Sequence, residues 1–141
     1  APSSLIILDL DHFKAVNDNH GHAKGDEILR RITEIVNLRI RVTDSLYRIG
    51  GEEFAIIFGN TTIDELGTLQ QQHRKAIERL DFHPENIRVT VSVGGTCVLA
   101  SDDSRSAFRR ADLALYAAKK GGRNQCKIET AIRPVCSGQI A

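Results

Sequence analysis

The stretch Tyr47–Phe54, YRIGGEEF, places two glycines and two acidic residues directly before the apolar run AIIF. The segments on either side, SLYRI and FAIIF, are rich in the aliphatic and aromatic residues typical of strands. A glycine-containing turn between two such runs predicts a β-hairpin. A plain turn does not require two adjacent glutamates, so Glu52 and Glu53 are candidates for a functional site.

Outside the hairpin, apolar runs typical of strands alternate with apolar repeats typical of helices. Polar residues interrupted by Gly21 and Gly25 predict a short helix and then a loop. Thr62 and Glu65 form a capping-box pattern, which predicts the start of a long helix. The other expected elements are a strand over 4–11, a helix over 26–41, hairpin strands over 45–49 and 54–58, a strand over 87–99, a helix over 104–120 and a short strand over 124–129.

The expected order is β-α-α-β-β-α-β-α-β, which predicts an α/β (α+β) fold with a ferredoxin-like antiparallel sheet flanked by helices. In this topology Asp9, at the end of the first strand, lies beside the hairpin turn with Glu52 and Glu53. Three carboxylates at one place repel one another unless a cation lies among them. Hard oxygen ligands of this kind suit Mg²⁺ or Mn²⁺. Asp11, on the same face of the strand as Asp9, is expected to be a solvated acid.

Composition and charge exclude several classes of protein. The net charge of +1 provides no bulk attraction for nucleic acid or an anionic membrane. No apolar run approaches the roughly 18 residues needed to span a bilayer, and no signal peptide is evident. The three cysteines, Cys97, Cys126 and Cys136, lack metal-ligand spacing, and their odd number argues against a disulfide framework. We therefore expect a cytoplasmic location for this domain.

Four spaced motifs together resemble the GGDEF family of diguanylate cyclases: DLDHFKAVNDNHGHAKGD at 9–26, RVTD at 41–44, RIGGEEF at 48–54 and ADLALYAAKKGGRN at 111–124. The resemblance covers residues from about 3 to 129. It implies a palm-type sheet, shared with nucleotidyl cyclases and polymerases. It also implies an enzyme of bacterial signalling that joins two GTP molecules into cyclic di-GMP and releases two pyrophosphates.

The resemblance also implies how the chain is organised. Residues 1–130 would form the GGDEF domain, and residues 131–141 a loosely held C-terminal tail. Family members usually carry a stretch D-x-L-T-x-L-x-N-R before the first strand, so we expect a fragment of a longer protein. The implied partners are GTP, cyclic di-GMP, a second copy of the domain and a regulatory domain. That longer protein could be anchored in a membrane.

By resemblance, Mg²⁺ or Mn²⁺ would be bound by Asp9, the backbone carbonyl of Leu10 and Glu52, with Glu53 nearby or also a ligand. Glu52 would in addition deprotonate the attacking 3′-hydroxyl. Two metals about 4 Å apart can hold the attacking and leaving oxygens of such a reaction.

The resemblance assigns a second group of residues to GTP. Asn17 and Asp26 would hydrogen-bond the guanine edge, and His22 would lie close to the base or ribose. A carboxylate suits guanine because it accepts from the N1–H and the N2 amino group, a donor pair that adenine lacks.

For the phosphates, the resemblance implies the side chains of Lys14, Lys119 and Arg123, together with the backbone amides of Phe13 and Lys14. Gly51 would be small because the nucleotide lies over the turn.

The RVTD motif resembles the inhibitory RxxD site of the family, which lies five residues ahead of the signature motif. Arg41 and Asp44 would bind a cyclic di-GMP dimer, with Arg48 as a third contact. The competing interpretation of Arg41 and Asp44 is an ion pair at a helix end.

Two of the GTP-binding assignments also have simpler interpretations. Lys119 and Arg123 would suit a helix C-terminus, where the dipole favours cations, and His22 would suit an ordinary loop position. At the level of function, two further classes stay open. One is a receptor for GTP or cyclic di-GMP that has lost catalysis, and the other is a different palm-type enzyme, such as a mononucleotide cyclase or a polymerase.

Overall fold

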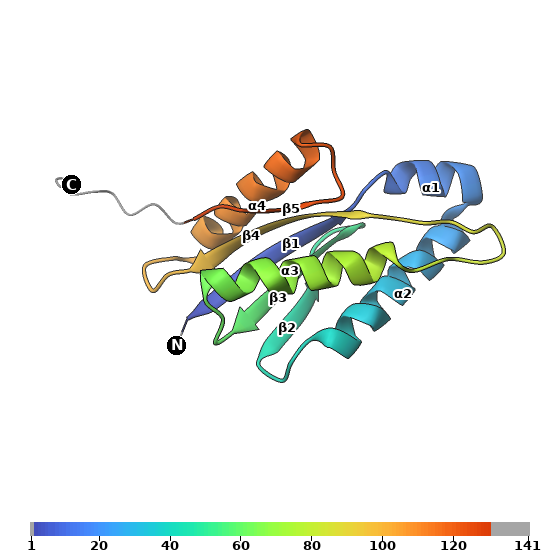
Figure 1. The fold of residues 1–141 in the computed structure, drawn as a ribbon. Helices are drawn as coiled ribbons and strands as arrows, with labels where there is room; N and C mark the ends of the chain where they lie inside the picture. Colours follow the sequence, from blue (N-terminus) through green and yellow to red (C-terminus); the bar gives the residue numbers. More distant parts are fainter. Residues whose placement is uncertain (1, 131–141) are drawn as a thin grey trace.

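The computed structural model describes residues 2–130, in which four helices surround a five-stranded sheet (Figure 1). The elements in chain order are β1 (Ser3–Leu10), α1 (Phe13–His20), α2 (His22–Arg39), β2 (Asp44–Arg48), β3 (Glu53–Gly59), α3 (Ile63–Glu78), β4 (Val91–Val98), α4 (Ser104–Lys120) and β5 (Cys126–Ile128). This is the predicted order of strands and helices.

The strands lie in the order β2-β3-β1-β4-β5, with β1 in the centre. β1 is antiparallel to both of its neighbours, and β2 is antiparallel to β3. β5 pairs with β4 in parallel, so the predicted antiparallel sheet has one parallel pair at its edge. The predicted fold class is confirmed.

The two faces of the sheet are covered differently (Figure 1). Alternate side chains of β1, namely Ile6, Leu8 and Leu10, belong to a large core shared with α2 and α3. The intervening Leu5 and Ile7 belong to a smaller core under α4. Because successive strand residues point to opposite faces, the face with Leu5 and Ile7 also carries Asp9.

The prediction of a loop before residue 26 is wrong, because α2 already begins at His22. Gly21, with φ of 89°, is the residue that separates α1 from α2. Gly25 lies buried inside α2, where a Cβ atom would come within 1.9 Å of Asn17 Oδ1. Gly25 therefore permits the close approach of α1 rather than ending a helix. The helix also ends at Arg39, two residues before the predicted end.

The observed strand β4 is shorter than the strand predicted over 87–99, because it begins only at Val91. Before it, Phe82 and Ile87 pair with each other through two backbone hydrogen bonds of 3.0 Å and bury their side chains. The capping box of Thr62 and Glu65 is present as predicted.

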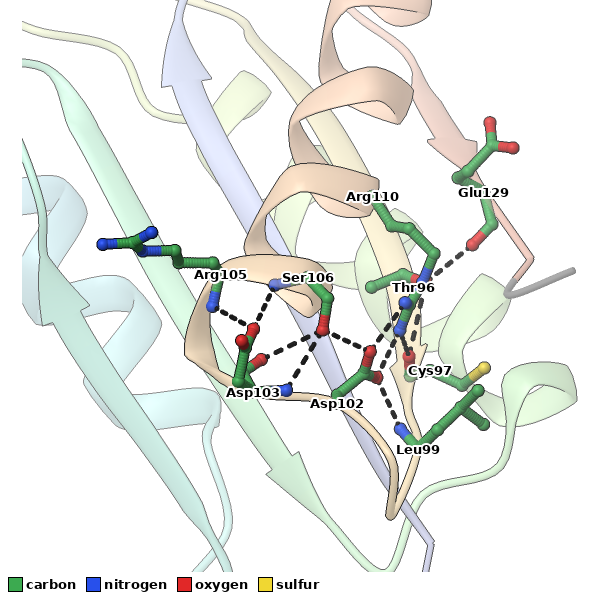
Figure 2. A network of polar contacts seen from close by, with 9 residues as sticks. All are labelled: Thr96, Cys97, Leu99, Asp102, Asp103, Arg105, Ser106, Arg110 and Glu129. Atoms are coloured by element: carbon green, nitrogen blue, oxygen red, sulfur yellow. Dashed lines mark hydrogen bonds and ion pairs between the residues drawn. The ribbon is translucent and has the colours of Figure 1, made fainter. Parts of the chain in front are cut away.

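A polar network holds the start of α4 (Figure 2). The Asp102 carboxylate accepts hydrogen bonds from Leu99 N (2.7 Å), Ser106 Oγ (2.6 Å) and both terminal nitrogens of Arg110 (2.8 and 2.5 Å). These bonds, those from Arg110 above all, hold the pKa of Asp102 far below its usual range although burial opposes them. Arg110 Nε also donates to Thr96 Oγ1 of β4 at 3.0 Å. The network thereby fixes α4 on the sheet.

No helix among residues 2–130 is long and apolar enough to cross a membrane. The predictions for the tail at 131–141 and for Cys136 concern residues outside the described range. Cys97 and Cys126 are partly buried free thiols.

Candidate active site

Three carboxylates meet where β1 ends and the hairpin turn begins. Asp9 is paired in register with Glu53, and Leu10 N donates to Glu52 O at 3.2 Å. Asp9 is only 5% exposed, and both glutamates are half-buried. The sheet order places β3 beside β1, so the fold brings together the acidic residues that the sequence pattern singled out.

The electrostatics of this carboxylate cluster (Asp9, Glu52 and Glu53) are those of crowded acids. Burial, followed by the close approach of Asp9, raises the pKa of Glu52. Burial and the charge of Asp9 also raise the pKa of Glu53. The charge of Lys119 opposes both shifts. Crowding of this kind is relieved by a cation.

In the structure, a cation is supplied by the last turn of α4. Lys119 Nζ donates to Asp9 Oδ2 at 2.5 Å. Within residues 2–130, no group of three or more His, Cys, Asp or Glu side chains is arranged to hold a metal ion. The donor set, three carboxylates and the Leu10 carbonyl, nevertheless has the hard oxygen chemistry that suits Mg²⁺ or Mn²⁺.

Asp11 is not the solvated acid that we expected. It is 6% exposed and accepts hydrogen bonds from Thr90 Oγ1 (2.7 Å), Ser92 Oγ (2.6 Å) and Asn124 N (3.0 Å). The partners lie 79 to 113 positions away, so no local pattern could reveal them. Asp11 therefore joins the end of β1 to the start of β4 and to the segment that follows α4.

Asn124 is a second residue whose role sequence reasoning missed. Its amide donates to Glu78 Oε2 at 2.8 Å and accepts from Arg74 Nη1 at 2.7 Å, both on α3. Arg123 and Asn124 both have positive φ, 64° and 46°. Asn adopts this left-handed region more readily than most residues. An Asn two positions after Gly122 is the only sequence signal for it. The contacts of Asn124 hold the backbone next to Arg123.

The residues predicted to hold guanine come from two adjacent helices. Asn17 is on α1, and its Oδ1, buried against Gly25, has no hydrogen-bond partner among the described residues. Asp26, on α2, is exposed and lines a hollow of about 160 Å³. His22 is the exposed first residue of α2. A larger hollow of about 390 Å³ lies between α1 and residues 85–90 and is lined by none of the residues predicted to bind GTP.

The side chains predicted to bind phosphate come from the start of α1, from the last turn of α4 and from the segment just after it. Phe13 begins α1 with a buried side chain, whereas Lys14 is exposed and pairs with Asp18 at 2.9 Å. Arg123 is exposed just after α4. At Gly51 a Cβ atom would meet nothing within 4 Å, so the chain itself does not require glycine there. Open space over the turn is compatible with a ligand that approaches closely.

Arg41 and Asp44 form a closed ion pair in the connection between α2 and β2. Arg41 Nε and Nη2 donate to the two Asp44 carboxylate oxygens, each at 2.9 Å. Nη2 also donates to Gly59 O (3.1 Å) and Thr61 Oγ1 (2.6 Å), which joins the pair to the end of β3. Burial alone would raise the pKa of Asp44. The hydrogen bonds from Arg41 outweigh burial, so the pKa of Asp44 lies below its usual value. The Asp44 side chain is 1% exposed, whereas that of Arg41 is 42% exposed.

Arg48, predicted to assist this pair, lies at the opposite end of β2 from Asp44. Its guanidinium donates to Gly50 O (3.1 Å) and Gly51 O (2.7 Å). Arg48 therefore braces the hairpin turn and lines the hollow beside Asp26.

Comparison with known proteins gives one consistent result. A family model described as "Diguanylate cyclase, GGDEF domain" matches residues 1–125. The chain is 37% identical over 126 residues to the diguanylate cyclase DgcP of Pseudomonas aeruginosa, which covers 88% of this chain and 19% of that protein. It is also 37% identical over 128 residues to a diguanylate cyclase of Vibrio cholerae, covering 90% of this chain and 40% of that protein. The chain thus spans well under half the length of these curated relatives.

Solved structures agree with the sequence relatives. The active GGEEF domain of a diguanylate cyclase from Vibrio cholerae superposes with a TM-score of 0.87 at 36% identity, covering 93% of this chain and 85% of that chain. The GGDEF domain of DgcB from Caulobacter crescentus, solved in complex with c-di-GMP, superposes with a TM-score of 0.84 at 33% identity, covering 91% of this chain and 76% of that chain.

Proposed function

The chain belongs to the GGDEF domain family of diguanylate cyclases, and we propose that it condenses two GTP molecules into cyclic di-GMP with release of two pyrophosphates. The observation that carries the proposal is the carboxylate cluster at the GGEE turn, with Lys119 against Asp9. Nucleotidyl transfer requires mainly positioning and neutralisation of phosphate charge. A buried acidic cluster beside basic side chains meets that requirement.

We propose Asp9, the carbonyl of Leu10, Glu52 and Glu53 as the residues that would hold Mg²⁺ or Mn²⁺. When bound, such an ion supplies charge neutralisation of the triphosphate and polarises the phosphoryl group. The fit rests on the hard oxygen donors and on the crowding that raises the pKa of both glutamates.

Glu52 is proposed to accept the proton of the attacking 3′-hydroxyl. Burial and the nearby Asp9 raise the pKa of Glu52, and a raised pKa makes a carboxylate a better proton acceptor. Its place at the turn, with its backbone bonded to Leu10, holds it next to Asp9.

Recognition of guanine is assigned to Asn17 and Asp26, with His22 near the base or ribose. The exposed carboxylate of Asp26 can accept from both donors of the guanine edge, and Asn17 packs against the neighbouring Gly25.

For the phosphates we propose Lys14, Lys119 and Arg123, with the amides of Phe13 and Lys14 at the start of α1. The N-terminus of a helix favours anions because its backbone N–H groups have no partner within the helix. Gly51, which lies under open space, would let the nucleotide approach the turn.

We further propose that cyclic di-GMP binds at Arg41 and Asp44 as an inhibitor. The partly exposed guanidinium of Arg41 borders a hollow of about 280 Å³ beside α3. Arg41 would contact the ligand, and the buried Asp44 would hold Arg41 in place. Arg48 is proposed to act at the hairpin turn instead, because it braces that turn.

The test is chromatography of the products formed by the protein from GTP and Mg²⁺. We expect cyclic di-GMP and pyrophosphate from the wild type. Glu52→Gln keeps the shape but removes the charge, so turnover should fall at least about 100-fold, as is common on loss of a catalytic base. Glu34→Gln, at an exposed position of α2, is the matched control and should keep wild-type activity. Binding of GTP without any product in the wild type would show a receptor instead of an enzyme.

A further inference from the structure

The contact between Lys119 and Asp9 joins two residues from opposite ends of the chain. Lys119 lies in the last turn of α4, and Asp9 lies near the end of β1, 110 positions earlier. The Asp9 side chain is 7% exposed, whereas that of Lys119 is 35% exposed. One partner is therefore fixed in the sheet, and the other reaches the site on a flexible four-carbon stem.

A lysine at this position blocks part of the carboxylate cluster. An ammonium 2.5 Å from Asp9 Oδ2 occupies a binding position on that oxygen. Mg²⁺ binds carboxylate oxygens at about 2.0–2.1 Å, and a lysine charge so close to it would be strongly repelled. Lys119 and the ion therefore compete for the same oxygen of Asp9.

We propose that Lys119 is an exchangeable counter-ion of the metal site: it neutralises Asp9 in the metal-free protein and leaves Asp9 when a divalent cation binds. The role of the released lysine rests on the proposed function, because the freed ammonium is then available for the phosphates of GTP. The nucleotide–metal complex brings both the cation for Asp9 and the anion for Lys119, so the exchange keeps every charge paired.

The exchange has a measurable consequence for metal affinity. When a binding-competent state is populated only in part, the apparent affinity falls by that fraction. Removing Lys119 should therefore tighten metal binding when no nucleotide is present. A lysine that serves only to bind phosphate would leave this affinity unchanged.

The experiment is calorimetric titration of Mn²⁺ into the nucleotide-free protein. Lys119→Gln should bind Mn²⁺ at least about fivefold more tightly than the wild type, since a hydrogen bond between charged groups no longer has to be broken. Lys119→Arg keeps a cation and should stay within about twofold of the wild type. Lys120→Gln is the matched control, because Lys120 lies over the Tyr116 ring, 5.6 Å from its centroid, and should leave the affinity unchanged.

Equal or weaker Mn²⁺ binding by Lys119→Gln would overturn the proposal, and so would an absence of Mn²⁺ binding in all variants. The Asp9→Asn variant should lose Mn²⁺ binding, which identifies the site that is titrated. None of these titrations contains GTP, so a failure of the exchange is distinguishable from a failure of the proposed activity.

A second measurement uses the wild-type protein and does not depend on the folding of a variant. Saturating Mg²⁺ should increase the acetylation of Lys119 by acetic anhydride severalfold, as read by peptide mass spectrometry, because the amine is released from Asp9. Acetylation of Lys120 in the same helix should not change. If Mg²⁺ leaves the labelling of Lys119 unchanged, the exchange does not occur.

Discussion

At the scale of single residues, His73 is a buried histidine that makes stability depend on pH. It is 3% exposed and packs against Phe58, with 5.9 Å between the ring centroids. Burial, then the charge of Arg39, lowers its pKa to about 4, although Asp44 opposes the shift. As the pH falls from about 6.5, His73 therefore takes up a proton in the unfolded chain before it does so in the folded protein. Stability is complete above that pH and is lost as the pH falls toward 4.

We predict that the free energy of unfolding in urea decreases by about 2 kcal/mol between pH 7 and pH 5 through this group alone. His73→Leu should remove that part of the pH dependence, because leucine binds no proton. The exposed His83→Gln should keep the wild-type dependence. Parallel pH curves for the wild type and His73→Leu would show that the folded protein carries the proton on His73 as readily as the unfolded chain.

At the scale of elements, the ion pair of Arg41 and Asp44 connects α2 and β2 with the end of β3. Arg41→Ala would leave the buried Asp44 without its charged partner, which we expect to cost about 2–3 kcal/mol of stability. The same change should lower the affinity for cyclic di-GMP at least about tenfold, since it removes a charged hydrogen-bond donor. Calorimetric titration of cyclic di-GMP, beside initial rates with GTP, measures the second effect.

Thr61→Val separates the two roles of Arg41. It removes the hydroxyl that accepts from Arg41 Nη2 but keeps the guanidinium itself. Stability should fall, while cyclic di-GMP binding stays near the wild-type level.

If Arg41→Ala binds cyclic di-GMP as tightly as the wild type, the RVTD stretch is a structural ion pair and not a binding site. The initial rate with GTP should stay near normal or rise in Arg41→Ala, because the product no longer inhibits.

At the scale of the whole molecule, the reaction proposed above would require two copies of the domain. The carboxylate cluster and the proposed guanine residues would provide one nucleotide site in residues 2–130, and in the proposed reaction each GTP is attacked by the 3′-hydroxyl of the other. We therefore predict that the rate rises faster than linearly with protein concentration until dimers saturate. Initial rates over a dilution series, with the mass of the species measured by light scattering, provide the check. A strictly proportional rate down to a demonstrated monomer would exclude this prediction.

Much of the fold could be predicted from local patterns. The hairpin around the GGEE turn, the capping box at Thr62 and the apolar repeat of α4 depend on residues within a few positions of one another. Backbone hydrogen bonding and periodic burial are local properties, so the sequence carries them directly. The closeness of Asp9 to Glu52 and Glu53 could also be predicted from the sequence, because the order of elements implied that β1 lies beside the hairpin.

Gly25 shows where local patterns mislead. Glycine is unfavourable inside a helix, and together with Gly21 and the polar residues around it Gly25 indicated a loop between α1 and α2. In the structure the absence of a side chain lets Asn17 pack against α2, and this packing outweighs the weak helix preference of one residue. Whether a glycine interrupts a helix or accommodates a neighbour depends on what packs against it.

The order of the elements, the motifs of the family and the acidic cluster at the turn could all be predicted from the sequence. Which polar groups pair depended on the tertiary structure: Lys119 with Asp9, and Asn124 with Asp11 and Glu78. Most of these partners lie tens of positions apart, and many acids and bases in the chain have the right charge to pair. Only the packing of α3 and α4 on the sheet brings particular pairs within hydrogen-bond distance, where burial makes their contact strong.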